Sequence, residues 1–109
     1  MIHSCRTRAD FDRLRHEGVR VSGTRLWVRH VNDSTCTPPR VAFALSRRNG
    51  SAPMRNRLRR QVKAILRDPE FALPGGLYLI GHRGPIASTP AADLRVELER
   101  LVADRGRAR

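Results

Sequence analysis

The sequence predicts an α+β protein, a two-layer α–β sandwich whose elements follow the order α-β-β-α-β-α. Short runs rich in β-forming residues alternate with two longer segments in which apolar residues recur every three or four positions. The chain has 109 residues, the size of one domain. Its apolar fraction of 39% is enough for a modest core and too high for a disordered tail. We therefore expect a single domain over residues 1–104.

A short helix over residues 7–17 opens the predicted fold, after residues 1–6, which look unstructured. Thr7 is the expected N-cap, and Asp10 three residues later suits the positive end of a helix. Gly18 supplies the stop.

Two strands are expected next, over residues 25–31 and 40–46. In the second, Val41, Phe43 and Leu45 point to one side of the sheet. Residues 32–39 form a polar loop that is short enough for an antiparallel hairpin between the two strands.

The second helix is expected over residues 54–67, after a loop that ends in proline. Asp68 and the proline after it end this helix. Its apolar stripe consists of Met54, Leu58, Val62, Ile65 and Leu66.

The third strand and the last helix complete the pattern. Residues 77–80 are fully apolar, which is typical of a strand in the centre of its sheet. Thr89 is the expected N-cap of a helix that begins at Pro90 and runs to Asp104. Residues 105–109 are expected to be a disordered basic tail.

Positive charge dominates the composition. The 22 Lys and Arg residues outnumber the 10 Asp and Glu residues, which gives a net charge of +12. A charge of this size attracts polyanions such as RNA, DNA or an acidic membrane surface. Lys63 is the only lysine. A GC-rich codon bias explains the preference for arginine, but it does not explain the excess of positive over negative charge.

This charge is concentrated in residues 40–67, which include nine basic residues and no acidic one. On a helical wheel, the basic residues of the second helix cover the arc opposite its apolar stripe, with Asn56 near the middle. Like charges at this spacing repel by a few tenths of a kcal/mol per pair. Because a merely solvated face would mix both signs, this arc predicts a bound polyanion.

The same segment reads RVAFALSRRNGSAPMRNRLRRQVKAILR and resembles the signature of the bacterial ribonuclease P protein family. The shared features are a strand ending in Ser46, two basic residues, a glycine-containing turn and an RNR core with more basic residues after it. The core and its continuation are Arg55, Asn56, Arg57, Arg59 and Arg60. The first helix, the third strand and the closing helix also match the family in order.

The resemblance implies a fold with a left-handed βαβ crossover, like domain 2 of ribosomal protein S5. It also implies an accessory subunit of an endoribonuclease that removes the 5′ leader from precursor tRNA. The ribonuclease P RNA would perform the chemistry with Mg²⁺ that the RNA and the substrate hold, and the protein would contribute no catalytic residue. One protein per RNA is expected, and it would strengthen the binding of substrate and metal.

Site residues follow from the resemblance position by position. Ribonuclease P RNA and precursor tRNA would be bound by Arg47, Arg48, Arg55, Asn56, Arg57, Arg59, Arg60, Lys63 and Arg67. The cleft for the single-stranded leader would be formed by Phe11, Arg15, Arg29 and Ser46.

The chain departs from the family at two aromatic positions of this cleft, where Arg15 and Arg29 stand. Trp27 is close to one of these positions but is expected to face the other side of the sheet. Leader binding should therefore depend on cations more than on base stacking.

Two other kinds of nucleic-acid-binding protein share some of these features. A ribosomal or assembly protein that binds rRNA would have similar charge and fold, but would not require RNR after this strand and turn. A DNA-binding regulator would need a helix-turn-helix pair, whereas strands precede the basic helix here. A membrane-surface role fits poorly, because the core needs the apolar face of that helix.

Protein-based catalysis and metal binding have no support in the sequence. The four histidines, His3, His16, His30 and His82, show no metal-ligand spacing. Neither Cys5 nor Cys36 belongs to a CxxC pair, and residues 1–10 lack the apolar segment of a secretion signal. We expect a cytoplasmic protein with reduced thiols.

Overall fold

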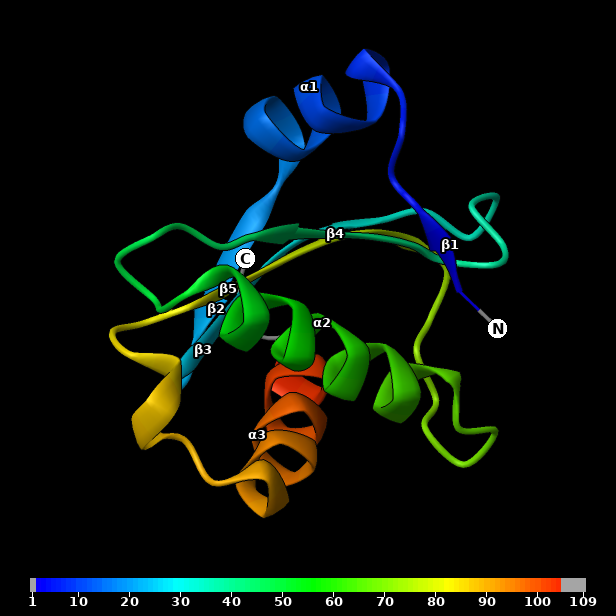
Figure 1. Ribbon diagram of the computed structural model, residues 1–109. Coiled ribbons are helices and arrows are strands. Elements are labelled where there is room, and N and C mark those ends of the chain that lie inside the picture. The colour runs from blue at the N-terminus through cyan, green and yellow to red at the C-terminus, as the bar shows by residue number, and fades with distance from the viewer. Residues whose placement is uncertain (1, 105–109) are drawn as a thin grey trace.

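The computed structural model describes residues 2–104, which form a mixed sheet with helices on both faces (Figure 1). The strands are β1 (His3–Ser4), β2 (Val19–Ser22), β3 (Leu26–Asn32), β4 (Arg40–Ala44) and β5 (Gly76–His82). The helices are α1 (Arg8–Glu17), α2 (Ala52–Arg67) and α3 (Ala91–Asp104), and a 3-10 turn, η1, spans Ile86–Ser88. The predicted α+β class is confirmed. The tail over residues 105–109, expected to be disordered, lies outside the described residues, as does Met1.

The first helix has the ends that the sequence predicts. The Thr7 hydroxyl accepts a hydrogen bond from the Asp10 N–H at 3.1 Å, which caps the N-terminus of α1. At the other end, the Gly18 N–H donates to the Leu14 carbonyl at 3.2 Å. Both capping residues are therefore confirmed.

The five strands follow the order β1-β4-β5-β3-β2, so β5 is central, as its apolar sequence predicts. The expected hairpin between β3 and β4 is wrong, because β5 lies between them, antiparallel to β3 and parallel to β4. Nearly every residue of β5 is buried, and such a strand needs a hydrogen-bonded neighbour on each side.

Two short strands, β1 and β2, were not predicted. Residues 1–6 were expected to be unstructured, but β1 pairs in parallel with the start of β4. Its backbone is held by bonds from the His3 N–H to the Pro39 carbonyl at 2.8 Å and from the Cys5 N–H to the Val41 carbonyl at 3.0 Å. Because both side chains of β1 are exposed, no apolar alternation marks it in the sequence.

The second helix begins two residues earlier than predicted, after Ser51, whose hydroxyl accepts a hydrogen bond from the Met54 N–H. Leu58, Val62 and Leu66 are buried, which confirms most of the predicted stripe. Met54 is a correction: it is 38% exposed, because it lies in the first turn, where α2 extends past the core.

The last helix begins at Ala91, so Thr89 lies one residue too early to be its N-cap. The Thr89 hydroxyl instead lies 2.8 Å from Nε2 of His82, which links the segment before α3 to the end of β5. Leu94, Leu98 and Leu101 are buried, as the predicted apolar face requires.

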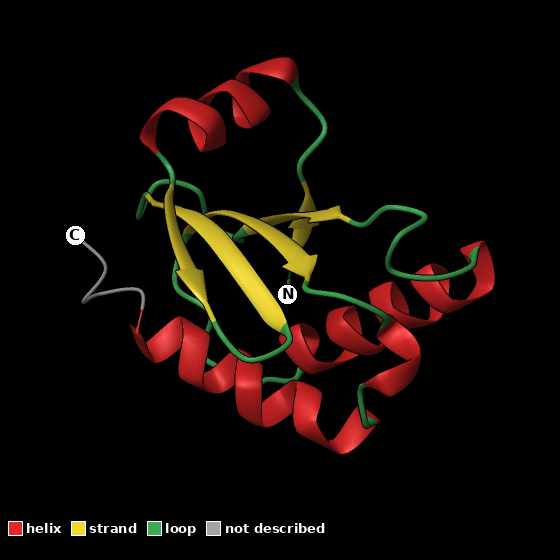
Figure 2. Ribbon diagram, turned by 90° about the vertical axis from the view of Figure 1, so that its left-hand side faces the viewer, coloured by secondary structure: helices red, strands yellow, loops and turns green. Residues whose placement is uncertain are grey.

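Helices cover both faces of the sheet (Figure 2). Each face has its own apolar cluster. The larger cluster lies between the sheet and α2 with α3, and includes Val41 and Phe43 as predicted. The smaller cluster lies under α1 and includes Leu14 and both cysteines. The functional surfaces described next are therefore distributed over two sides of one sheet.

Candidate nucleic-acid interface

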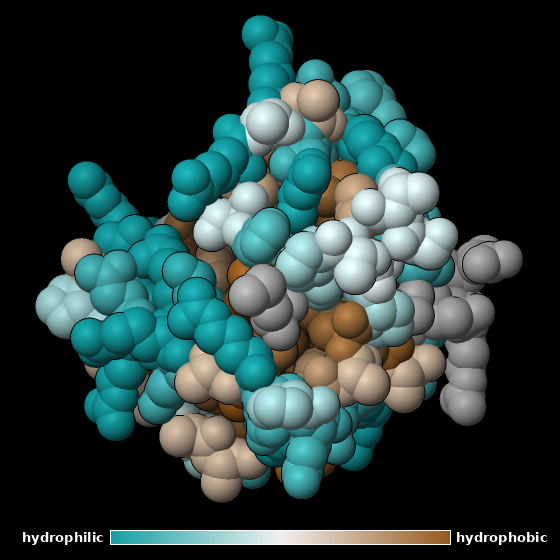
Figure 3. Space-filling model, turned by 90° about the vertical axis from the view of Figure 1, so that its right-hand side faces the viewer, coloured by the Kyte–Doolittle hydropathy of each residue, from teal (hydrophilic) through white to brown (hydrophobic). Residues whose placement is uncertain are grey.

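The predicted RNA-binding residues lie on one continuous stretch, the loop over residues 46–50 and the outer side of α2. We call them the α2 basic surface: Arg47, Arg48, Arg55, Asn56, Arg57, Arg59, Arg60, Lys63 and Arg67. Six of the nine are exposed and the other three, Arg55, Arg59 and Lys63, are half-buried. Hydrophilic side chains gather on the side where α2 lies (Figure 3).

The cations of this surface have no acidic partners within the described part of the chain. None of the ion pairs among residues 2–104 includes a cation of the loop or of α2. The contact within the surface is polar instead, from the Arg59 guanidinium to Oδ1 of Asn56 at 2.7 Å. Such an array attracts phosphate, because no ion pair among residues 2–104 neutralises it.

Asn49, which sequence reasoning missed, fixes the loop that holds Arg47 and Arg48. Its buried side chain donates to the carbonyls of His82 and Gly84 at 3.0 and 2.9 Å and accepts from the Ser46 N–H at 3.0 Å. Its own carbonyl accepts from the Ile86 N–H at 2.8 Å. The loop is therefore tied to the end of β5, although an asparagine beside glycine reads in the sequence only as a turn.

Three of the four predicted leader-cleft residues come together on the other side of the sheet. Phe11, Arg15 and Arg29 line a cavity of about 260 Å³ with Leu14 and Leu79, which we call the α1 cleft. Phe11 is 39% exposed, so its ring is accessible. The fourth predicted residue, Ser46, is not among the residues that line this cavity.

Arg29 has a structural task in addition to its predicted one. Its guanidinium donates to the carbonyls of Leu14 and Arg15, at 2.6 and 3.1 Å, at the C-terminal end of α1. A cation at this end satisfies helix carbonyls that lack intrahelical partners. Arg29 therefore holds α1 against the sheet and brings positive charge to the α1 cleft.

Trp27 faces the same side of the sheet as Arg29, which corrects the sequence prediction. In the register of β3 and β5, Arg29 lies opposite Leu79 and Trp27 lies opposite Gly81. The Trp27 ring lies so close over Gly81 that a side chain there would collide with it. The two-residue period of a strand, applied to 27 and 29, already places both residues on one face.

The guanidinium of Arg20 lies over the Trp27 ring, 4.5 Å from its centroid. The face of the sheet beyond the α1 cleft therefore presents an aromatic ring covered by a cation. Both kinds of group can stack on nucleic-acid bases, so this side of the sheet offers an aromatic ring as well as cations.

Potential metal ligands and the two thiols are the other groups for which the sequence sets expectations. Across residues 2–104, no three His, Cys, Asp or Glu side chains lie together as metal ligands. Cys5 and Cys36 are buried free thiols. Burial raises the pKa of Cys5 to about 11, so this thiol is protonated and unreactive at neutral pH.

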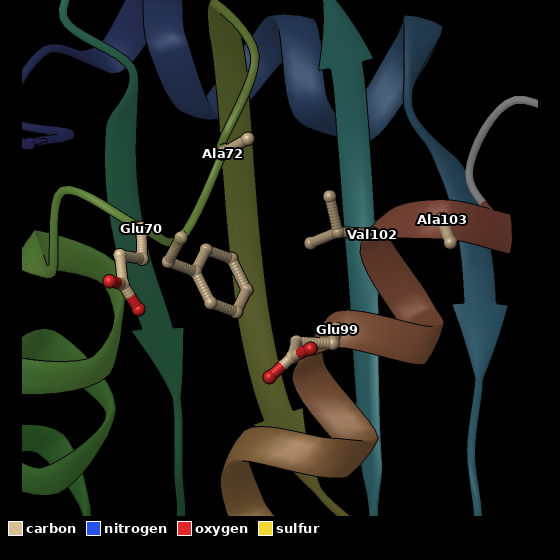
Figure 4. A pocket seen from close by; sticks show the side chains of 6 residues that line it. Glu70, Ala72, Glu99, Val102 and Ala103 are labelled. Atoms are coloured by element: carbon tan, nitrogen blue, oxygen red, sulfur yellow. The ribbon is translucent and has the colours of Figure 1, made fainter.

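A cavity of different character lies beside α3 (Figure 4). It has a volume of about 270 Å³ and combines the carboxylates of Glu70 and Glu99 with apolar groups of Phe71 and Val102. Its two carboxylates make this cavity a poorer site for phosphate than the α2 basic surface.

Comparisons with known proteins identify the family of this chain. The family model described as Ribonuclease P matches residues 2–105. A ribonuclease P protein component of Thermobifida fusca is 32% identical over 115 residues, which cover 94% of this chain and 78% of that protein. Another, from Beutenbergia cavernae, is 31% identical over 91 residues, which cover 83% of this chain and 76% of that protein.

Solved structures show the same fold. The RNase P protein of Staphylococcus aureus superposes with a TM-score of 0.80 at 19% identity, over 93% of each chain. The RNase P protein of Thermotoga maritima gives a TM-score of 0.76 at 22% identity, over 92% of this chain and 94% of that one.

Proposed function

Because this chain belongs to the ribonuclease P protein family, we propose that it is the RNA-binding protein subunit of a bacterial ribonuclease P. Its partner in this proposal is the ribonuclease P RNA, with one protein per RNA. The complex removes the 5′ leader from precursor tRNA. The observation that carries the proposal is the α2 basic surface, whose cations have no acidic partners among the described residues.

The protein acts by holding RNA and not by attacking it. Arginines of α2 neutralise phosphates, and the released counterions make binding strong and dependent on salt. Asn56 and its neighbours can also donate to sugar hydroxyls and base edges. The RNA subunit performs the cleavage in this proposal, with Mg²⁺ held by that RNA and the substrate.

The leader of the substrate would lie on the α1 side of the sheet. Phe11 offers an exposed ring in the α1 cleft, and Arg15 and Arg29 supply positive charge beside it. A leader held here adds binding energy to precursor tRNA that mature tRNA cannot obtain. Product release is then favoured over product retention.

The leader-cleft assignment is tested by the affinity for precursor tRNAs whose leaders differ in length. Phe11→Ala and Arg15→Gln should lower the gain in affinity that a longer leader gives. Arg29→Ala should do so as well, but it also frees two carbonyls of α1, so its helix content must be measured. If none of the three changes the dependence on leader length, the assignment is wrong.

The function itself is tested by reconstitution. The protein is mixed with a bacterial ribonuclease P RNA and a precursor tRNA at low Mg²⁺, where the RNA alone is slow. We expect 5′ maturation to be stimulated and the cleavage position to be unchanged. Tight binding to rRNA fragments without stimulation of maturation would favour an rRNA-binding protein instead.

A further inference from the structure

A second basic site lies at the β1 edge of the sheet, at the opposite end of α2 from the loop over residues 46–50. It is a cavity of about 440 Å³ lined by Ile2, His3, Ser4, Arg6, Arg40 and Arg67. We call it the β1-edge pocket. The view in Figure 3 looks onto the side of the molecule where β1 lies in Figure 1.

The pocket exists because three distant segments meet. Parallel pairing sets His3 beside Arg40, which places the N-terminal segment next to the start of β4. Arg67 joins them from the last turn of α2. Arg40 forms an ion pair with the buried carboxylate of Asp10, at 3.0 Å, so one wall of the pocket is fixed to α1.

The lining is positive and contains no carboxylate. Arg6 and Arg67 are exposed and have no ion-pair partner within residues 2–104. Asp10 neutralises Arg40 but is not among the residues that line the cavity. The unpaired guanidinium groups of Arg6 and Arg67 repel each other across the cavity unless an anion lies between them, and guanidinium forks match phosphate oxygens.

Simpler roles account for single residues but not for the arrangement. A charge at an edge strand discourages pairing with other chains, and an arginine in a last helical turn favours the helix dipole. Neither role requires side chains from β1, β4 and α2 to surround a single cavity.

We propose that the β1-edge pocket binds a phosphate group, and that in the assembled particle this group is a phosphodiester of the RNA partner. The inference rests on the proposed function for the source of the phosphate, but not for the chemistry of the pocket. It extends the path of RNA past the end of α2 to the N-terminal segment. Arg6 thereby becomes an RNA-binding residue outside the family motif.

The test begins with the protein alone. Nuclear magnetic resonance signals of the arginine Nε–Hε groups are followed while inorganic phosphate replaces chloride at constant ionic strength. The signals of Arg6 and Arg40 should shift and saturate. Arg6→Gln should weaken phosphate binding by about tenfold or more, the effect of one charge-assisted hydrogen bond. Arg6→Lys should bind phosphate with an affinity between that of the unsubstituted protein and that of Arg6→Gln.

Arg8→Gln is the matched control, because Arg8 is an exposed arginine of the same segment that does not line the pocket. It should leave phosphate binding unchanged. Equal weakening by Arg8→Gln, or shifts that spread over all exposed arginines without saturation, would show general charge screening and overturn the proposal. Circular dichroism of each variant confirms that α1 and α2 are formed.

The second arm adds ribonuclease P RNA in phosphate-free buffer. The same two signals should shift, and Arg6→Gln should lower the salt dependence of RNA affinity by about one unit of log–log slope. If RNA binds and these signals do not move, an RNA phosphodiester is not the occupant and the proposal fails. If phosphate saturates the pocket but the RNA does not bind, the proposed function fails while the phosphate site stands.

Discussion

The helices α2 and α3 pack on the same face of the sheet, yet their charged residues serve opposite purposes. Every charge on α2 is positive, and none of them takes part in an ion pair among residues 2–104. On α3, Asp93 pairs with Arg25, and Arg95 pairs with Asp68 and Glu99. The Glu97 carboxylate accepts from the N–H groups of Arg25 and Leu26. The charges of α3 hold the fold together, and those of α2 remain available for a partner.

Paired substitutions in the two helices should show this difference most clearly. Arg57→Gln with Arg60→Gln removes two exposed cations of α2 and should weaken RNA binding by about tenfold or more. The free energy of unfolding should stay equal or rise by a few tenths of a kcal/mol, because like charges are removed. Filter binding at two salt concentrations and urea unfolding measure the two effects.

The matched change in α3 is Arg95→Gln with Arg100→Gln. It should leave RNA affinity nearly unchanged and lower the free energy of unfolding by about 1 kcal/mol, because two half-exposed ion pairs are lost. If both double variants weaken RNA binding equally, the positive charge acts as a whole and the contrast between the helices is wrong.

The loop before α2 should combine both kinds of effect. Asn49→Ala removes hydrogen bonds to two carbonyls and one N–H, so the free energy of unfolding should fall by about 1–3 kcal/mol. RNA affinity should also fall severalfold, because Arg47 and Arg48 lose their fixed position. Unchanged urea unfolding for this variant would contradict the anchoring role.

The α1 side of the sheet can be observed through its tryptophan, the only one in the chain. Precursor tRNA should change the fluorescence of Trp27 more than mature tRNA does, because only the precursor has a leader to lie near the ring. Equal changes with both RNAs would place the leader elsewhere. Trp27→Phe should lose the signal and keep most of the affinity.

The smallest effect concerns pH and the link between α2 and α3. The Glu70 N–H and the Arg95 guanidinium lower the pKa of the carboxyl of Asp68, the residue whose backbone N–H caps the end of α2. An unfolded Asp has a pKa of about 3.9, so this stabilisation is complete above that pH and is lost as the pH falls further. The melting temperature of Asp68→Asn should therefore depend less on pH below about 4. A pH dependence equal to that of the unsubstituted chain would contradict this contribution.

Local signals in the sequence predicted most of the fold. Thr7 and Gly18 bound α1, and the apolar repeat with Asp68 placed α2. Pairing between distant strands carried no such signal. The loop over residues 32–39 is equally compatible with a hairpin and with a crossing past β5. The sheet decided between them because the apolar β5 needs two neighbours.

The candidate site was predicted where charge or family resemblance marked it, and missed where contacts decide. Asn49 and Arg6 are ordinary polar residues in the sequence. The structural role of Asn49 comes from its hydrogen bond to the end of β5. The proposed role of Arg6 comes from a cavity that residues of β1, β4 and α2 also line. The side of the sheet on which Trp27 lies follows from the two-residue period of a strand, so it could have been predicted from the sequence.

We propose that the α2 basic surface holds the RNA that performs the cleavage. Single-turnover cleavage of precursor tRNA by ribonuclease P RNA, measured as Mg²⁺ is varied, tests this role. The unsubstituted protein and the Arg95→Gln/Arg100→Gln variant should lower the Mg²⁺ requirement alike. The Arg57→Gln/Arg60→Gln variant should have the same effect only at a higher protein concentration. At saturating concentration of this variant, the cleavage rate should be similar to that with the unsubstituted protein. If the cleavage rate at saturating protein falls by as large a factor as the RNA affinity, the proposal is wrong, because these arginines would then contribute to the chemical step itself.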